Sequence, residues 1–91
     1  MDARRALTKF GRPSRVQVVY RTPAEARIIW RISIGPPEWL IILTKPGGAQ
    51  LTLRSRDRNF DAARRELGEM GWDLSEAEDR ARSHPWVRAD A

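Results

Sequence analysis

The sequence predicts an α+β fold, in which a four-stranded antiparallel β-meander is followed by one main helix packed on one face, with a short C-terminal helix after it (ββββα). Apolar and polar residues alternate in short segments between residues 15 and 55, and turns that contain Pro or Gly separate these segments. Beyond residue 59, apolar residues recur every three or four positions, which is typical of a helix. The 91 residues suffice for one domain.

The N-terminal segment is interpreted as either a short helix or an unstructured basic arm. Asp2 is suited to cap a helix whose apolar side carries Ala3, Leu7 and Phe10. A flexible arm is the alternative. We divide the chain into a short helix or basic arm at 1–14, a single ββββα domain at 15–74, and a short helix with a tail at 75–91.

The sheet is expected to have one covered face and one open face. A helix of about thirteen residues covers only one side of four strands. Burying a large apolar side chain yields roughly 1.5–3 kcal/mol, so the richest apolar cluster should lie beneath the helix. The strands are expected at 15–21, 26–34, 38–44 and 49–55. The covered face is expected to carry Val16, Val18, Tyr20, Ile28, Trp30, Ile32 and Ile34.

The main helix follows the last strand. Phe60, Ala63, Leu67 and Met70 form one apolar stripe, and Asn59 precedes it as a plausible N-cap. The run "SEAE" at 75–78 indicates a capping box that begins the short second helix.

The turn "KPGG" at 45–48 assigns the third strand's faces. Pro46 and Gly47 suit the two central positions of a type II turn. If they form a two-residue loop, Lys45 pairs with Gly48. This register places six residues on the open side, and a one-residue slip would reverse it. The six are Trp39, Ile41, Leu43, Gln50, Thr52 and Arg54.

The open face is therefore expected to have an apolar centre and an arginine-rich surround. The expected first hairpin sets Arg21 opposite Arg27, a like-charge pair that an anion lying over it would relieve. An exposed apolar patch on a small domain usually marks a binding surface. The expected apolar interface comprises Val19, Ile29, Ile41 and Leu43. The expected nucleic-acid contacts are Arg15, Arg21, Arg27, Arg31, Trp39, Arg54, Arg56 and Arg58.

Charge is unevenly distributed along the chain. Residues 1–58 carry 12 Lys and Arg against 4 Asp and Glu, whereas residues 59–91 carry 5 against 8, giving a net charge of +5. A basic half attracts polyanions, and Arg combined with aromatic surfaces suits single-stranded nucleic acid slightly better than duplex. The meander-then-helix order resembles, in element order alone, that of whirly-type and coactivator-type single-stranded DNA-binding proteins. The first hypothesis is therefore a sequence-tolerant nucleic-acid-binding domain.

The alternative hypothesis is a protein-interaction module. An apolar centre with an Arg-enriched rim is also typical of protein interfaces, so a homodimer joined through the open faces, or an accessory or inhibitor subunit docked on a larger protein, fits as well. An enzyme is not expected, because the chain has one His, no Cys and no glycine-rich phosphate loop. No cofactor and no metal site are expected.

No apolar run is long enough for a membrane span or for the core of a signal peptide. The absence of Cys excludes disulfides and thiolate chemistry. A cytoplasmic, soluble protein is the expectation.

Overall fold

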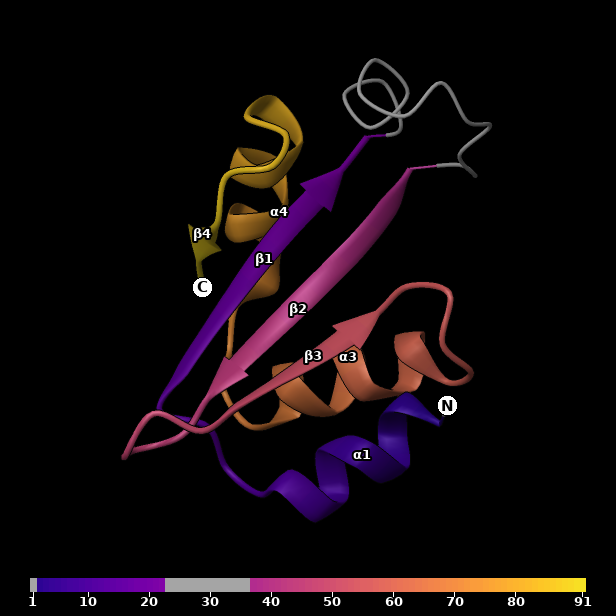
Figure 1. Cartoon of the computed structure of the whole chain (residues 1–91), viewed down its shortest axis with the longest axis vertical. Helices are drawn as coiled ribbons and strands as arrows, with labels where there is room; N and C mark the ends of the chain where they lie inside the picture. Colours follow the sequence, from indigo (N-terminus) through magenta and orange to yellow (C-terminus); the bar gives the residue numbers. More distant parts are fainter. Residues whose placement is uncertain (1, 23–36) are drawn as a thin grey trace.

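A computed structural model describes residues 2–22 and 37–91, which form a four-stranded antiparallel sheet and three helices of the α+β class (Figure 1). The strand order in the sheet is β3-β2-β1-β4. The elements along the chain are α1 (Ala3–Phe10), β1 (Arg15–Arg21), β2 (Glu38–Thr44), β3 (Gln50–Arg54), α3 (Phe60–Glu69), α4 (Leu74–Ser83) and β4 (Ala89–Asp90).

The order of the strands corrects the predicted meander. Strand β1 pairs along its whole length with β2, so 15–21 and 38–44 are adjacent strands of the sheet. The strand predicted at 26–34 lies outside the described residues. On its other edge β1 pairs with β4, where Val18 lies opposite Ala89. The predicted C-terminal tail therefore contains the fourth strand of the sheet.

The β2–β3 turn explains a second correction. Gly48 N–H donates to the Lys45 carbonyl over 3.0 Å and Gly47 has a φ of 98°, as the predicted type II turn requires. Gly48 also has a positive φ, of 100°, and so adds one residue to the loop. Thr44 consequently pairs with Gln50, a one-residue slip that exchanges the two faces of β2. Trp39, Ile41 and Leu43 thereby leave the predicted open side, whereas Gln50, Thr52 and Arg54 remain on it.

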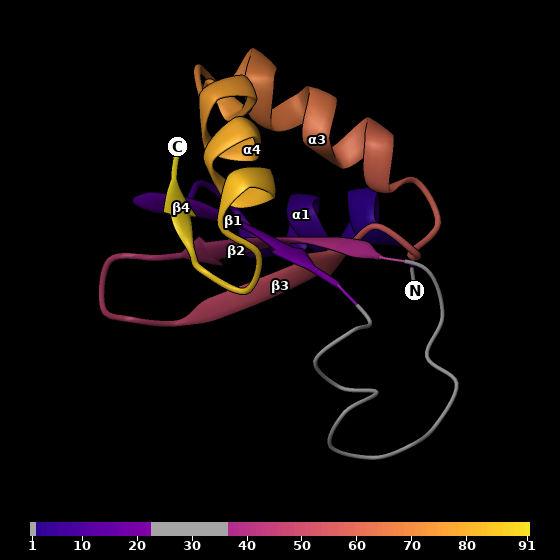
Figure 2. The ribbon, with the colours of Figure 1, turned by 90° about the horizontal axis from the view of Figure 1, so that it is seen from above.

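In the described part of the chain, three helices rather than one main helix build the covered side of the sheet. Helices α3 and α4 lie over one face (Figure 2), and α1 packs against α3 beside β3. All three contribute to one core, and the predicted covered side chains of β1 belong to it. The largest fully buried side chains are Leu7, Val16, Val18, Ile41, Leu43, Leu53 and Leu67.

The helix ends agree with the sequence only in part. Residues 3–10 are helical, and the Asp2 carboxylate accepts the N–H groups of Arg4 and Arg5 as an N-cap. Asn59 directly precedes α3, but with φ at 62° its side chain makes no capping hydrogen bond. Helix α4 begins earlier than expected, because Asp73 rather than Ser75 caps it. It has ten residues, the same length as α3, so it is not a minor element.

Candidate nucleic-acid interface

The sheet face opposite the helices is not the exposed apolar surface that the sequence predicts. Its apolar centre is Val19, Leu40 and Ile42, which are only 4–6% exposed, although no helix among residues 2–22 and 37–91 lies over them. The prediction that Ile41 and Leu43 lie at an exposed interface is wrong, because the shifted register places both in the helix-covered core. Val19 does lie on this face but is buried, and Ile29 lies outside the described residues.

Two predicted phosphate contacts on this face already have acidic partners. Arg15 Nε lies 2.9 Å from Asp90 Oδ1, and Arg21 Nη1 lies 3.3 Å from Glu38 Oε1. Strand pairing places Arg21 opposite the acidic Glu38, and the like-charge pair predicted for Arg21 involves Arg27, which lies outside the described residues. Any anion at this face would have to compete with these carboxylates. Arg27 and Arg31 lie outside the described residues.

Trp39 lies on the helix-covered side instead of the predicted open side. Its ring packs against Tyr20 with the ring centroids 4.7 Å apart. The Arg82 guanidinium of α4 lies 5.4 Å from the centroid of the Trp39 ring, which is a cation–π distance. Trp39 therefore lines a cleft between α3 and α4 and does not lie on the sheet face opposite the helices.

The predicted segment "RSRDR" (54–58) forms a turn between β3 and α3. The Asp57 N–H donates to the Arg54 carbonyl over 2.9 Å, and the Asp57 carboxylate accepts the Arg54 N–H over 3.2 Å. Arg56 and Arg58 are exposed and Arg54 is half-buried. This turn presents three arginine residues at the end of the edge strand.

Helix α1 adds cations that sequence reasoning did not nominate. Ala3 N–H donates to the Arg58 carbonyl over 2.8 Å, so α1 begins beside the turn. Lys45 Nζ lies 4.8 Å from the Phe10 ring centroid, so α1 ends beside the β2–β3 turn. Arg5 and Lys9 lie four positions apart on α1 and are both exposed, away from its buried side.

The cationic residues of the turn at 54–58, of α1 and the residues just after it, and of the β2–β3 turn form what we call the β3-edge basic surface. No acidic group within 4.0 Å pairs with any of its side chains in the described part of the chain, whereas six other arginines there do have such partners. Helix α1 spans roughly 12 Å at 1.5 Å per residue, which sets the scale of the surface. Arg12 follows α1 by two positions and is exposed. The members of the surface are Arg5, Lys9, Arg12, Lys45, Arg54, Arg56 and Arg58.

The acids beside this surface are engaged with backbone groups. The Arg5 backbone N–H and then the Asn59 side chain hold the pKa of Asp2 below its usual value. Asp57 binds the Arg54 N–H within its own turn. Both carboxylates therefore accept hydrogen bonds from backbone N–H groups, and the cations of the surface outnumber them.

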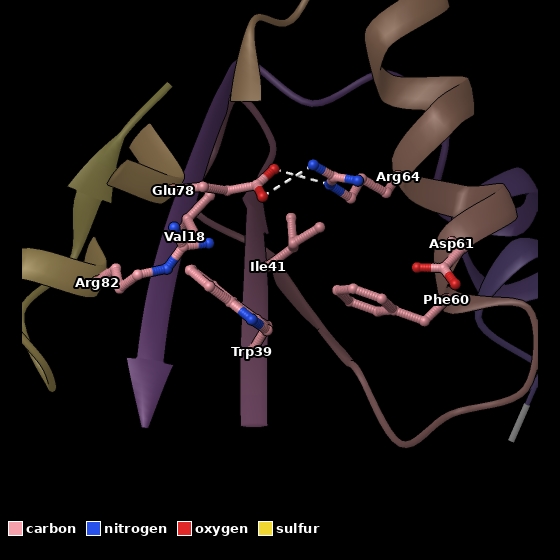
Figure 3. A pocket seen from close by; sticks show the side chains of 8 residues that line it. All are labelled: Val18, Trp39, Ile41, Phe60, Asp61, Arg64, Glu78 and Arg82. Atoms are coloured by element: carbon pink, nitrogen blue, oxygen red, sulfur yellow. Dashed lines mark hydrogen bonds and ion pairs between the residues drawn. The ribbon is translucent and has the colours of Figure 1, made fainter. Parts of the chain in front are cut away.

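A cleft of about 160 Å³ opens between α3 and α4 on the helix side of the sheet (Figure 3). Its floor is made by side chains of β1 and β2, and Phe60 enters from α3. Arg64 and Glu78 bridge the two helices with hydrogen bonds of 2.7 and 2.8 Å. The cleft is lined by Val18, Trp39, Ile41, Phe60, Asp61, Arg64, Glu78 and Arg82.

A second aromatic feature lies where the chain returns from α4 to the sheet. Trp86 has a φ of 72°, which is uncommon for a bulky residue, and is 36% exposed. Its backbone N–H donates to the Tyr20 carbonyl over 2.9 Å, and the Arg21 guanidinium lies 5.4 Å from its ring centroid. The adjacent Val87 is 57% exposed.

Comparisons with known protein families, with curated proteins and with solved structures give no match. Across residues 2–22 and 37–91, no helix has the length and apolar character needed to cross a membrane, and no cluster of His, Asp or Glu is suited to hold a metal ion.

Proposed function

We propose that this domain binds nucleic acid through the β3-edge basic surface, with little dependence on base sequence. The observation that supports this proposal is the gathering of seven cationic side chains without acidic partners along one edge of the described structure. Cations that already have partners must give up an ion pair to meet a phosphate. Those of the β3-edge basic surface need not.

Phosphate recognition fits the chemistry of this surface. Lys and Arg neutralise phosphates and release condensed counterions, and this contribution to affinity is independent of sequence. The proposed site keeps Arg54, Arg56 and Arg58 from the sequence-based set and replaces the sheet face with α1 and the β2–β3 turn. Arg15 and Arg21 have carboxylate partners, so they have lower priority as contacts.

A charge-matched pair of double variants tests the assignment. Arg56→Gln/Arg58→Gln removes two cations from the surface, and Arg65→Gln/Arg88→Gln removes two exposed arginines that lie elsewhere. Each phosphate contact contributes about 0.7–0.9 to the slope of log K against log salt. The first variant is therefore expected to lower the slope for a labelled oligonucleotide by about 1.5, and the second to leave it nearly unchanged. Equal losses in both variants would mean that only net charge matters.

A protein-interaction module is the second candidate, and the exposed Trp86 and Val87 favour it. They are the large apolar side chains that the described residues leave most exposed, and Trp and Arg commonly dominate protein interfaces. For a homodimer, sedimentation of the wild type should show a dimer that Val87→Glu dissociates. Identical monomers in both samples would reject self-association through this patch.

A further inference from the structure

The side chains that line the cleft between α3 and α4 are suited to contact a flat ring. Figure 3 shows Phe60 and Trp39 entering the cleft from two sides, with Ile41 between them. Val18 completes an apolar floor supplied by the two central strands. Rings of this kind accept unstacked bases face to face, because every base has a π-face.

The size of the cleft restricts what can enter. Its volume is about 160 Å³. An apolar cavity of about 150 Å³ in another protein holds one benzene molecule, so this cleft is matched to a single six-membered ring. A pyrimidine has one such ring, whereas a purine has a second fused ring to accommodate.

The rim of the cleft offers both donors and acceptors. Arg64 is occupied by its two bonds to Glu78, which close one end. The Arg82 guanidinium lies 5.4 Å from the centroid of the Trp39 ring, and its ion pair with Asp79 is long, at 4.0 Å, so N–H groups at its edge remain for a base carbonyl. Asp61 is exposed at the first turn of α3, and a carboxylate there suits the exocyclic amino group of cytosine.

The cleft also adjoins the β3-edge basic surface. Trp39 N–H donates to Ser55 Oγ and Ser55 N–H donates to the Trp39 carbonyl, each over 2.9 Å. Phe60 follows Arg58 by two positions in the chain. A strand whose phosphates lie on the turn at 54–58 therefore passes the mouth of the cleft.

We infer that this cleft receives one pyrimidine base, cytosine in particular, from a single strand held on the β3-edge basic surface. The inference rests on the proposed function and adds a base site to it. Trp39 and Phe60 flank the base ring, and Arg82 and Asp61 meet its polar edge. A duplex would have to release a base to fill the cleft, so single strands are the favoured ligand.

The test compares a short oligodeoxycytidine with an abasic oligonucleotide of the same length and charge. Stacking of one base is expected to make the wild type bind oligodeoxycytidine about 5- to 150-fold more tightly. Trp39→Leu is expected to abolish this difference. Arg82→Gln, at an exposed residue whose loss should not unfold the domain, is expected to narrow it about 2- to 10-fold. Arg65→Gln makes the same charge change away from the cleft and should keep the difference.

The other outcomes would overturn either the base site alone or the proposed function together with it. Equal, salt-sensitive affinity for both oligonucleotides would overturn the base site and leave the proposed function standing. Binding of neither at low salt would remove the proposed function and the base site with it. A third arm follows the Trp39 indole NMR signal. Cytidine monophosphate should shift it, whereas a shift with N-acetylphenylalanine amide alone would assign the cleft to an aromatic side chain of a protein and overturn the inference.

Discussion

Ile41 and Leu43 show how one added loop residue decides the surroundings of every side chain in a strand. The sequence correctly predicts Pro46 and Gly47 at the centre of a type II turn. It does not reveal that Gly48 also adopts a positive φ, because glycine is permitted there without being required. Since successive strand residues alternate faces, this single position moves Ile41 and Leu43 from the predicted interface into the core.

Truncating Leu43 tests the observed register. The side chain is fully buried, so Leu43→Ala should cost about 2–5 kcal/mol of unfolding free energy through lost burial and a residual cavity. Gln50→Ala, at the exposed start of the paired strand, should change stability by less than about 0.5 kcal/mol. Urea unfolding measures both. Similar small effects would show that Leu43 does not face the core.

Asp2 should contribute to the acid sensitivity of the fold. Its folded pKa lies below the unfolded value because the Arg5 N–H favours the carboxylate. Its stabilisation is therefore present above the unfolded pKa, near 3.8, and is lost as pH falls through the lower folded pKa. Asp2→Asn keeps a capping acceptor but does not titrate, so thermal unfolding between about pH 5 and 2 should fall less steeply than in the wild type. Parallel curves would show that the Asp2 carboxylate is not coupled to folding.

Helix α4 shows why some elements are harder to predict from the sequence than others. Its buried residues Leu74, Ala77 and Ala81 include two small side chains that form only a weak apolar stripe. The same small side chains allow α4 to pack closely against β1. Strand β4, with two residues, is too short to show any alternation, so the sequence indicated only a tail. By contrast, the strong apolar stripe of α3 predicts that helix, whereas for residues 1–14 the sequence leaves a short helix and an unstructured arm as alternatives.

Close packing of α4 on the sheet predicts intolerance to larger residues. Ala81 is fully buried, so Ala81→Leu should cost about 1–3 kcal/mol by overpacking. Asp79→Leu introduces the same side chain at an exposed position of the same helix and should have a much smaller effect on stability. Chemical denaturation compares the two variants. An unchanged Ala81→Leu would mean that α4 can move away from β1 freely.

At the scale of the whole molecule, the charge division seen in the sequence becomes a division in space. The basic first part contributes all seven members of the β3-edge basic surface, whereas most acids of the second part pair with arginines, as Glu78 does with Arg64 and Glu76 with Arg80. The distribution of charge along the sequence indicates the basic half and the arginine-rich turn at 54–58. Only the folded chain brings α1 alongside β3, because that contact joins segments about fifty residues apart.

The whole surface should make binding strongly dependent on salt. If about five of its cations meet phosphates, log K against log salt should have a slope of about −3.5 for single strands and about −4.5 for duplex. Fluorescence anisotropy at several salt concentrations measures it. A slope near zero would show that phosphate contacts do not supply the affinity.

The pairing of Val18 with Ala89 also has a consequence for synthesis of the protein. Strand β1 leaves the ribosome early, but its second neighbour in the sheet and the helix that covers it are made last. Contacts between such distant segments carry a large loop-closure cost and form slowly. Strand β1 therefore lacks one of its two neighbours until residues 89–90 emerge, so we expect the sheet to be completed only after this domain has been synthesised.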